Sequence, residues 1–376
     1  MSPFDTPENA GHGAILTIDL AALVANWRML KQRAGTEAAA VVKANAYGIG
    51  IEPAVTALAK AGCKSFFVPH LSEAVRARAV APEATIYVLN GLAPETGGAY
   101  AEHDLSPVLG SHEELLEWAG FRQSGAMVRP AALHVDTAMN RLGLWPGEGL
   151  DLAREKSGVI AAAGIDLVMS HFAASEVLDD PANARQVSAF AEIAAAFPGV
   201  PASLLNSSGH FLPGCPSYQL TRPGYALYGG NPTPGQPNPM RPVVGLEAQI
   251  IQLREVETGT QVGYNGTWTA KGRRKLATIC LGYADGYPRN ASWTDRSQGG
   301  SAMVGGVRCP FVGTVSMDLI IVDVSDAPAD ATVRGAPATV IGGELDLEAV
   351  GAGAKTIGYE ILTSLGRRHA RRYVGL

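Results

Sequence analysis

Short apolar runs alternate with longer segments of helical periodicity over the first 230 residues of the chain. Apolar residues recur at helical spacing over 17–33, so an opening helix is expected there. The runs that follow are rich in apolar and β-branched residues, which is typical of buried strands. The eight candidate strands are 38–43, 64–68, 84–89, 105–109, 131–136, 165–170, 202–206 and 221–227, and candidate helices between them are 52–61, 72–80, 111–119, 148–162 and 182–195.

This order of strands and helices predicts an α/β fold with a parallel sheet. Eight such units in about 220 residues match the count and length of a (β/α)8 TIM barrel. A doubly wound open sheet is the alternative, but no Gly-x-Gly-x-x-Gly sequence follows the first strand. The barrel is therefore the favoured architecture for this part of the chain.

Proline recurs so often over 231–239 that neither a helix nor a central strand can continue there. Beyond it lie short β-like runs at 244–256, 275–281, 309–312, 319–324 and 338–341, with turn signals at Asn265-Gly266 and Gly305-Gly306. We therefore predict a barrel over 14–230, a Pro-rich linker over 231–242 and a smaller, mostly-β C-terminal domain over 243–376.

Composition narrows the classes of function that the chain can serve. The 376 residues carry a net charge of −5 and no long basic run, which argues against nucleic acid as a partner. We expect no signal peptide over 1–13, and no apolar stretch is long enough for a membrane span. The four cysteines form no Cys-x-x-Cys pair, so we expect free thiols, no metal and a cytoplasmic protein.

Lys43 is the first candidate for chemistry, because it closes the buried run 38–42. A lysine is rarely buried without a partner, since removing an ammonium from water is costly. It could be the anchoring amine of a carbonyl cofactor, as a desolvated lysine loses its proton easily and becomes a nucleophile. On the strand alone, the favoured interpretation is that the side chain extends into solvent at the strand tip.

Other polar side chains follow later strands, at the barrel end where active sites gather. Arg141 follows the fifth strand, His171 the sixth and Asn206 the seventh, while Arg222 lies in the eighth. Each of these residues taken alone has an ordinary structural interpretation. Their placement at the same end of the barrel indicates a functional site. The segment 207–209 offers hydroxyls and backbone N–H groups, and Gly224 would let the backbone approach an anion. A lysine amine facing a phosphate site is what pyridoxal 5'-phosphate requires.

The sequence resembles the alanine racemase family in several blocks that occur in the family's order, from about residue 15 to residue 373. The order of the blocks makes chance agreement implausible. The matching blocks are 42–48 (VKANAYG), 134–143 (HVDTAMNRLG), 170–173 (SHFA), 206–207 (NS), 222–229 (RPGYALYG), 262–264 (VGY), 282–286 (GYADG), 315–318 (VSMD) and 357–360 (IGYE).

This resemblance implies two opposed bases. Lys43 would bind pyridoxal 5'-phosphate covalently and act as the base on one face of the substrate Cα. Tyr264 would be the base on the opposite face, contributed by the other subunit of a homodimer with shared active sites. A racemase needs two such groups, because a proton leaves one face and another arrives on the other.

The resemblance also assigns the remaining site residues. Arg222 would face the pyridine nitrogen, His171 would lie near the ring, and Arg141 would reach the cofactor's phenolic oxygen and the substrate. Tyr47, Asn206, Ser207, Gly224, Tyr225 and Tyr359 would complete the cofactor site, most of them at the phosphate. Met317 would bind the substrate carboxylate through its backbone and Tyr283 would narrow the access channel, with Asp318, Arg289 and His134 in supporting roles.

Three positions depart from the family pattern. His134 stands where many members have a carbamylated lysine that positions the active-site arginine. The orientation of Arg141 must then rest on something else, such as a bound anion or His134 itself. Ala138 replaces a usual glycine, and Ser203 stands where a histidine often supports the arginine that faces the pyridine.

The implied activity is the interconversion of L- and D-alanine, an isomerase reaction that would either provide D-alanine for peptidoglycan precursors or serve the breakdown of D-alanine. A serine or broad-specificity amino-acid racemase stays open, because pocket shape decides the substrate and spacing does not. A pyridoxal-phosphate homeostasis protein would lack the β domain. A decarboxylase of similar plan would have an acidic group at the pyridine nitrogen, where this chain has Arg222.

Overall fold

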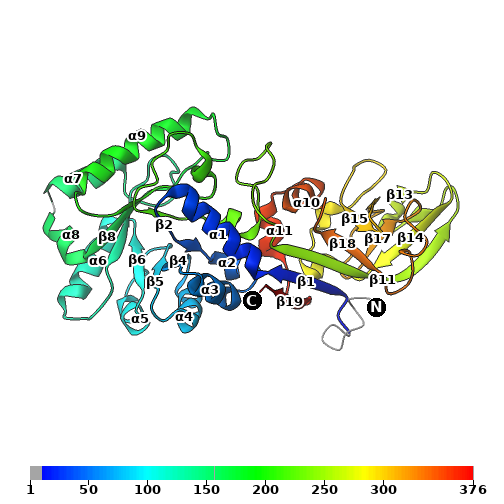
Figure 1. The fold of residues 1–376 in the computed structure, drawn as a ribbon, viewed down its shortest axis with the longest axis horizontal. Helices are drawn as coiled ribbons and strands as arrows, with labels where there is room; N and C mark the ends of the chain where they lie inside the picture. Colours follow the sequence, from blue (N-terminus) through cyan, green and yellow to red (C-terminus); the bar gives the residue numbers. More distant parts are fainter. Residues whose placement is uncertain (1–10, 156, 376) are drawn as a thin grey trace. The chain divides into compact units, whose positions relative to one another are not determined.

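Two compact units make up the chain in the computed structural model, which describes residues 11–155 and 157–375 (Figure 1). One unit runs from Leu23 to Arg241, and the other combines the described residues up to Ala22 with those from Pro242 onward. The expected boundaries of 14–230 and 243–376 thus differ from this division at the N-terminal end. The residues from Ala14 to Ala22 belong with the C-terminal unit.

The first unit is built on parallel strands that follow one another in sequence. They are β3 (Ala40–Val41), β4 (Ser65–Val68), β5 (Thr85–Val88), β6 (Ser106–Leu109), β7 (Ala131–His134), β8 (Ile165–Met169) and β9 (Ala202–Ser203). Phe66, Phe67 and Val68 are fully buried, as expected for strands that are covered on both faces. The predicted parallel α/β architecture is confirmed.

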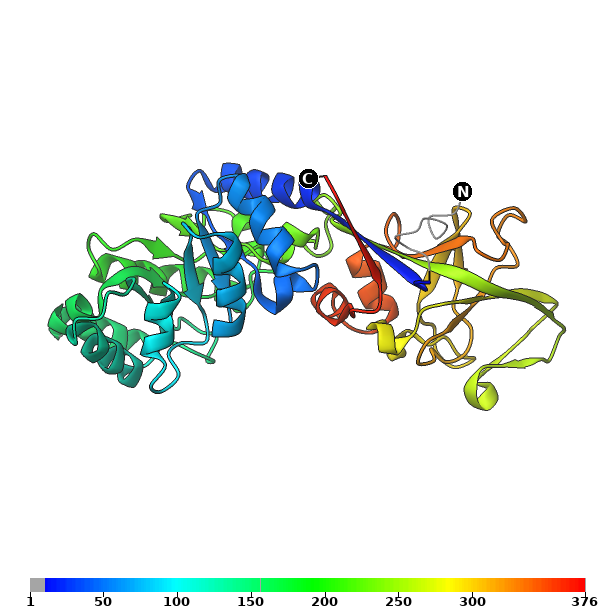
Figure 2. The same cartoon turned by 90° about the horizontal axis from the view of Figure 1, so that it is seen from below.

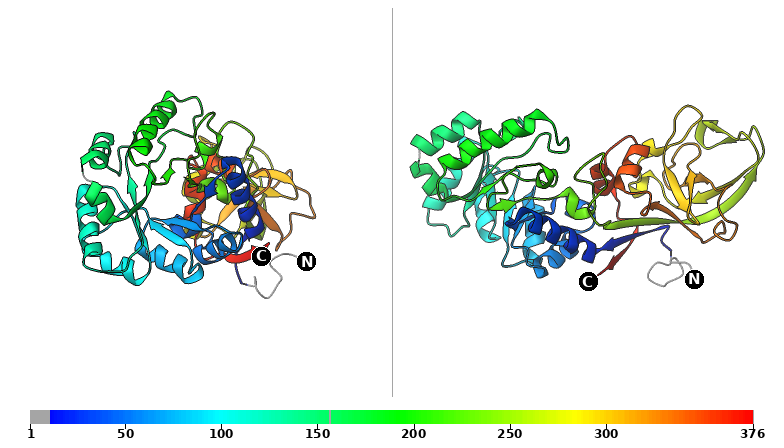
Figure 3. Two further views of the ribbon diagram at one scale, coloured as in Figure 1. Left: turned by 60° about the vertical axis from the view of Figure 1, so that its left-hand side comes forward. Right: turned by 45° about the horizontal axis from the view of Figure 1, so that its top comes forward.

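The eighth strand joins the last strand of this series to the first. β10 (Leu220–Thr221) pairs in parallel with β2 (Glu37–Ala38), and the Val41 amide donates to the Pro223 carbonyl at 2.9 Å. On its other side, the Arg222 amide donates to the Leu205 carbonyl at 2.8 Å. The ring of strands therefore closes through short ladders, with the helices on its outer side (Figure 3).

The helices of this unit largely match the expected ones. They are α1 (Leu20–Ala34), α2 (Lys43–Tyr47), α3 (Ile51–Lys60), α4 (Leu71–Val80), α5 (Gly97–Glu102), α6 (His112–Gln123), α7 (Pro146–Glu155), α8 (Ser157–Ala163), α9 (Pro181–Ala196), η2 (Ser208–Phe211) and η3 (Tyr225–Tyr228). Ser111 is the N-cap of α6, and its side chain accepts a hydrogen bond from Glu114 N–H. Asp180 is the N-cap of α9, and its side chain accepts a hydrogen bond from Ala182 N–H.

The expected start of the opening helix at Thr17 was wrong. Residues up to Asp19 form β1 (Ala14–Asp19), and α1 begins at Leu20. The carboxylate of Asp19 accepts a hydrogen bond from the Ala22 amide at 2.9 Å, which fixes this start. β1 pairs on both of its edges, and Ile15, Leu16 and Ile18 are fully buried.

The second unit is a β domain organised around one long strand, β11 (Val244–Val256), seen clearly in Figure 2. β11 pairs with β1, β14 and β18, and β1 pairs in turn with β19. The other elements are β12 (Gln261–Val262), η4 (Tyr264–Gly266), β13 (Trp268–Thr269), β14 (Arg274–Ile279), η5 (Tyr283–Asp285), η6 (Arg289–Ala291), β15 (Ser301–Val304), β16 (Val307–Pro310), β17 (Ile320–Asp323), β18 (Pro337–Ile341), α10 (Leu347–Gly353), α11 (Gly358–Ser364) and β19 (Ala370–Val374).

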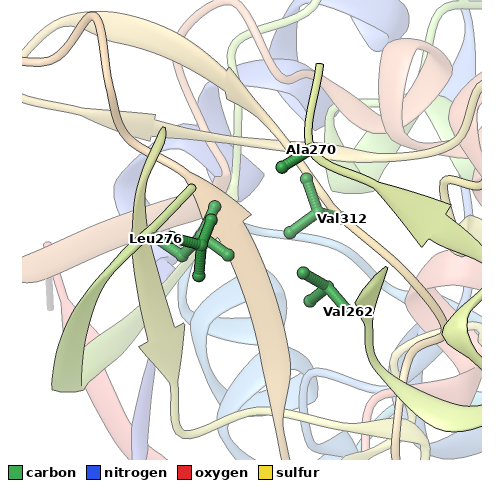
Figure 4. Close-up of a cluster of buried hydrophobic side chains, with 5 residues drawn as sticks. Val262, Ala270, Leu276 and Val312 are labelled. Atoms are coloured by element: carbon green, nitrogen blue, oxygen red, sulfur yellow. The ribbon is translucent and has the colours of Figure 1, made fainter. Parts of the chain in front are cut away.

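Packing and turns explain the shape of this domain. A cluster of five buried side chains (Val256, Val262, Ala270, Leu276 and Val312) lies beside β14, with Trp268 and Ile321 packed against it (Figure 4). Gly305 and Gly306 join β15 to β16 with positive φ angles of 58° and 80°, as the tight hairpin turn requires. The mostly-β C-terminal domain is confirmed, although β15 and β19 were not predicted.

Candidate active site

Lys43 stands at the carboxyl end of β3, where it is exposed and begins α2. The turn that follows is left-handed: Ala44, Asn45 and Ala46 have φ angles of 53°, 56° and 54°, and Tyr47 has 50°. This conformation costs roughly 1–2 kcal/mol for each residue that is not glycine. A strained turn directly after the lysine suggests that the direction of its side chain matters.

The surroundings of Lys43 favour a neutral amine. Nearby protein atoms remove part of its water, and the positive charge of Arg141 adds to this, so the pKa of Lys43 is lowered. The Lys43 Nζ atom lies 6.0 Å from the centre of the Tyr47 ring. Tyr47 in turn stacks on Tyr228 at 4.5 Å between ring centres, and the Tyr228 hydroxyl donates to the Val41 carbonyl at 2.9 Å.

The expected phosphate-binding residues Tyr47, Ser207 and Gly224 lie together. The Ser207 hydroxyl accepts hydrogen bonds from Gly224 N–H at 3.0 Å and from Ala226 N–H at 3.1 Å. A Cβ atom on Gly224 would lie 2.5 Å from the Tyr47 hydroxyl, so only glycine fits at this position. Tyr225 follows directly as the first residue of η3. The Ser207 hydroxyl, which can still donate its own hydrogen, and the Tyr47 hydroxyl beside the close backbone approach at Gly224 fit the phosphate of pyridoxal phosphate.

Arg222 is almost fully buried, and its positive charge is not neutralised by its described hydrogen bonds. Its guanidinium donates to the Ser203 hydroxyl and to the Ser170 carbonyl, both neutral oxygens. Burial lowers the pKa of Arg222 to about 9. Ser203 is thus a hydrogen-bonding support of Arg222. A buried cation of this kind fits a ring nitrogen that it contacts as a donor.

Two histidines near this charge are held neutral. The pKa of His171 is lowered to about 3 by burial and then by Arg222, Arg141 and Lys43. The pKa of His134 is lowered to about 4 by burial and then chiefly by Arg222. The Nε2 atom of His134 is buried and makes no hydrogen bond within the part of the chain that the structure describes. His134 therefore makes no described hydrogen bond that would orient Arg141.

Asp136, which sequence reasoning did not assign, organises the loop that carries Arg141. Its carboxylate accepts from the amides of Ala138, Met139 and Asn140 at 2.9, 2.7 and 2.5 Å. These bonds allow Asn140 to take a positive φ of 55°. An aspartate two to four residues before a polar turn is a known signal for such a loop, and it was available in the sequence.

Buried Gln186 and half-buried Asn206 hold the loops after β8 and β9. Gln186 donates to the His171 carbonyl at 2.9 Å and accepts from the Ala173 amide at 2.8 Å. Asn206 Oδ1 accepts from Gly209 N–H at 2.8 Å and from the Ser175 hydroxyl at 3.0 Å. The described contacts of Asn206 are thus with the protein, and Gln186 was not foreseen because it lies in the middle of α9.

In the β domain, the expected substrate residues Tyr283 and Met317 lie side by side. Tyr283 N–H donates to the Ser316 carbonyl at 3.0 Å, and Ala284 N–H donates to the Met317 carbonyl at 2.9 Å. Arg368, which was not predicted, binds Asp285 at 3.3 Å and Asp318 at 2.8 Å. Arg368 therefore ties the Tyr283 turn to the Met317 loop.

The other expected residues of the β domain stand on separate short elements. Tyr264 begins η4 and is 67% exposed, with Gly263 at a φ of 79° before it. Arg289 begins η6, and Tyr359 lies in the first turn of α11. Their roles at a shared site, like the pairing of Tyr264 with Lys43, stay predictions.

Neither a metal site nor a membrane span is found in the described residues. No group of three His, Cys, Asp or Glu side chains over 11–155 and 157–375 could hold a metal ion. No helix in the same ranges is long and apolar enough to cross a membrane.

A closed ring of parallel strands with a lysine after its first strand, joined to a β domain, defines a class of two-domain barrel proteins. Within that class, the family described as alanine racemase, N-terminal domain, matches residues 18–232. The family described as alanine racemase, C-terminal domain, matches residues 243–373. The chain belongs to the alanine racemase family.

Individual relatives agree with this assignment over nearly the whole chain. The alanine racemase of Methylobacterium sp. (strain 4-46) is 58% identical over 96% of this chain and 98% of its own. The alanine racemase of Methylobacterium nodulans is 57% identical over 97% of each. A crystal structure of alanine racemase from Bartonella henselae, with covalently bound pyridoxal phosphate, matches with a TM-score of 0.90 and 39% identity, covering 96% of this chain and 99% of that one.

Proposed function

We propose that this protein interconverts L-alanine and D-alanine with pyridoxal 5'-phosphate attached to Lys43. The observation that carries the proposal is the placement of Lys43, whose pKa is lowered, in a family member in which the Gly224 backbone, Ser207 and Tyr47 lie close together. We further propose that it acts as a cytoplasmic homodimer and supplies D-alanine for peptidoglycan precursors.

The cofactor supplies an electron-withdrawing ring that weakens the Cα–H bond of a bound amino acid. Lys43 holds or releases the proton on one face of that carbon, and its lowered pKa makes the amine a readier proton acceptor than a free lysine. Tyr264 of the partner subunit serves the opposite face. Arg222 keeps its positive charge and donates to the ring nitrogen without readily giving up a proton. Met317 orients the substrate carboxylate through its backbone.

Purified protein that is assayed with L-alanine tests this proposal. We expect D-alanine to form, a bound-cofactor absorbance band to be present, and Lys43→Ala to lose both. Lys60→Ala, an exposed lysine of α3, is the matched control and should keep both properties. A parallel assay with L-serine tests the broader substrate range. Lack of alanine turnover in cofactor-loaded protein would reject the proposal.

Exchange of the α-hydrogen of alanine in deuterated water distinguishes the contribution of Lys43 from that of Tyr264. Tyr264→Phe should lower racemisation by about a hundredfold or more, the usual contribution of a general base. It should retain exchange of the α-hydrogen for one enantiomer of alanine, because Lys43 remains on its own face. Equal loss of exchange for both enantiomers would contradict the division of work between Lys43 and Tyr264.

A further inference from the structure

The left-handed turn after Lys43 is held from outside by Glu73, a residue of the first turn of α4. One carboxylate oxygen of Glu73 accepts a hydrogen bond from Ala44 N–H at 3.0 Å. The other oxygen accepts from Asn45 N–H at 2.7 Å. Both amides belong to residues with positive φ, so a single carboxylate satisfies two donors at the start of the strained turn.

A second attachment comes from Arg76, one helical turn further along α4. Asn45 Oδ1 accepts from the Arg76 guanidinium at 2.8 Å and from Ile51 N–H at 3.1 Å. Arg76 is itself fixed by a two-bond pair with Glu52 of α3, at 2.6 and 2.7 Å. The turn is therefore fastened to α4 at two points three residues apart, which lie on one face of a helix.

The bonds from Glu73 reach the backbone of the turn and not the amine. They meet the two amides that follow Lys43, so their effect on the amine is through the direction of the chain. The charges that act on the Lys43 amine come from elsewhere, chiefly Arg141. Ala44 N–H belongs to the peptide plane that also contains the Lys43 carbonyl, so its bond to Glu73 restrains the ψ angle of Lys43 and thereby the position of the Lys43 backbone at the end of β3.

We propose that Glu73 is a positioning residue, which holds the left-handed turn and thereby aims the Lys43 amine at the carbonyl carbon that it must attack. This inference rests on the proposed function for the identity of the aldehyde, pyridoxal phosphate. In the attachment, the Lys43 nitrogen bonds to the aldehyde carbon, a carbon–nitrogen double bond forms and one water leaves. Misplacement of a reacting group by about 1 Å can cost roughly a hundredfold in rate.

The test measures how fast full-length protein, stripped of cofactor, attaches pyridoxal phosphate at Lys43. The absorbance change gives the rate, and borohydride reduction followed by peptide mapping gives the lysine. Glu73→Gln keeps one accepting oxygen but sets an NH2 group against a backbone N–H. We expect it to slow attachment by about ten- to a hundredfold and to lower kcat more than it raises KM for alanine.

A rescue variant distinguishes an effect on the position of the Lys43 amine from an effect on the stability of the whole protein. Ala44→Gly removes the cost of positive φ, so in the Glu73→Gln background it should restore much of the attachment rate. Wild-type attachment in Glu73→Gln would overturn the proposal, and so would a slow variant that Ala44→Gly does not restore. If Glu73→Gln fails to fold, Arg76→Met replaces it: slower attachment than in the control Ser72→Ala, an exposed position of the same helix, supports the proposal, and equal rates overturn it.

The same experiments keep this inference apart from the proposed function. A wild-type protein that attaches pyridoxal phosphate but does not racemise alanine defeats the proposed function alone. A wild-type protein that does both, beside a Glu73→Gln variant that does both equally well, defeats the positioning role alone.

Discussion

The hydroxyl of Tyr47 lies 2.5 Å from the place that a Cβ atom would take on Gly224. Tyr47 cannot easily withdraw, because it is buried and stacked on Tyr228. The two residues thus come from opposite ends of the barrel sequence and exclude any side chain between them. Their proximity depends on the closure of the ring by β10.

Gly224→Ala is expected to weaken retention of pyridoxal phosphate by about tenfold or more, because Tyr47 or the backbone must shift by a large part of an ångström. Cofactor loss during dialysis, followed by absorbance, measures the effect. Gly120→Ala in α6 is the control, since a Cβ there meets nothing within 4 Å. Adding Tyr47→Phe to Gly224→Ala should recover part of the loss, and strictly additive losses would argue against the contact.

Ser203→Ala is expected to destabilise the barrel by about 1–3 kcal/mol, because Arg222 loses an acceptor in a buried position. Urea unfolding followed by circular dichroism gives the free energy of unfolding. Ser188→Ala, on the exposed side of α9, should stay within about 0.5 kcal/mol of the wild type. Similar stabilities for the two variants would show that Arg222 finds another acceptor.

Acid should destabilise the protein partly through His134. Its pKa is about 4 in the folded protein against an ordinary value of 6.5, so the unfolded chain binds more protons between these values. The free energy of unfolding should therefore fall as the pH drops from about 6.5 to 4, by at most roughly 1.4 kcal/mol per pH unit for one proton. Urea unfolding over this range should show a shallower slope in His134→Gln. The same substitution at exposed His70 is the control, and an unchanged slope in His134→Gln would contradict the assignment.

Arg368→Met is expected to raise KM for alanine by roughly three- to tenfold with a smaller change in kcat, because binding groups that lose their support weaken substrate binding more than chemistry. The reason is that Arg368 links Asp285 to Asp318, beside Tyr283 and Met317. Steady-state kinetics measure both constants. Arg367→Met, at the exposed neighbouring position, should leave them near the wild-type values.

The sequence predicted the strand before Lys43 because a continuous apolar run has few alternatives in a parallel sheet. It did not predict the left-handed turn, since alanine and asparagine carry no signal strong enough to specify positive φ over four residues. The turn depends on Glu73, which lies 30 positions beyond Lys43 and is recognisable only in three dimensions. The local sequence pattern was thus enough to place Lys43 at the end of a strand. The conformation of the turn that follows it depends on tertiary contacts.

The start of α1 was misplaced for a related reason. β1 carries Ile15, Leu16 and Ile18, and this apolar run merges into the helical pattern of α1 without a break. What makes it a strand is its pairing with β11 and β19, which lie more than 220 positions away. Asp285, Arg368 and Gln186 escaped prediction likewise, because each acts through contacts that spacing does not reveal.

The pairing of β1 also orders events during synthesis on the ribosome. The strands that close the ring, β2 and β10, have both been made once Thr221 is added, whereas β1 precedes both of its partner strands in the sequence. Ile15 and Leu16 of β1 can pair with β11 only after Leu246 has left the ribosomal exit tunnel. The other edge of β1 is paired at these two residues by Ala370 and Arg371 of β19. Among the described strands, β1 is thus the first in sequence, and it cannot be paired on both edges until β19 has been made.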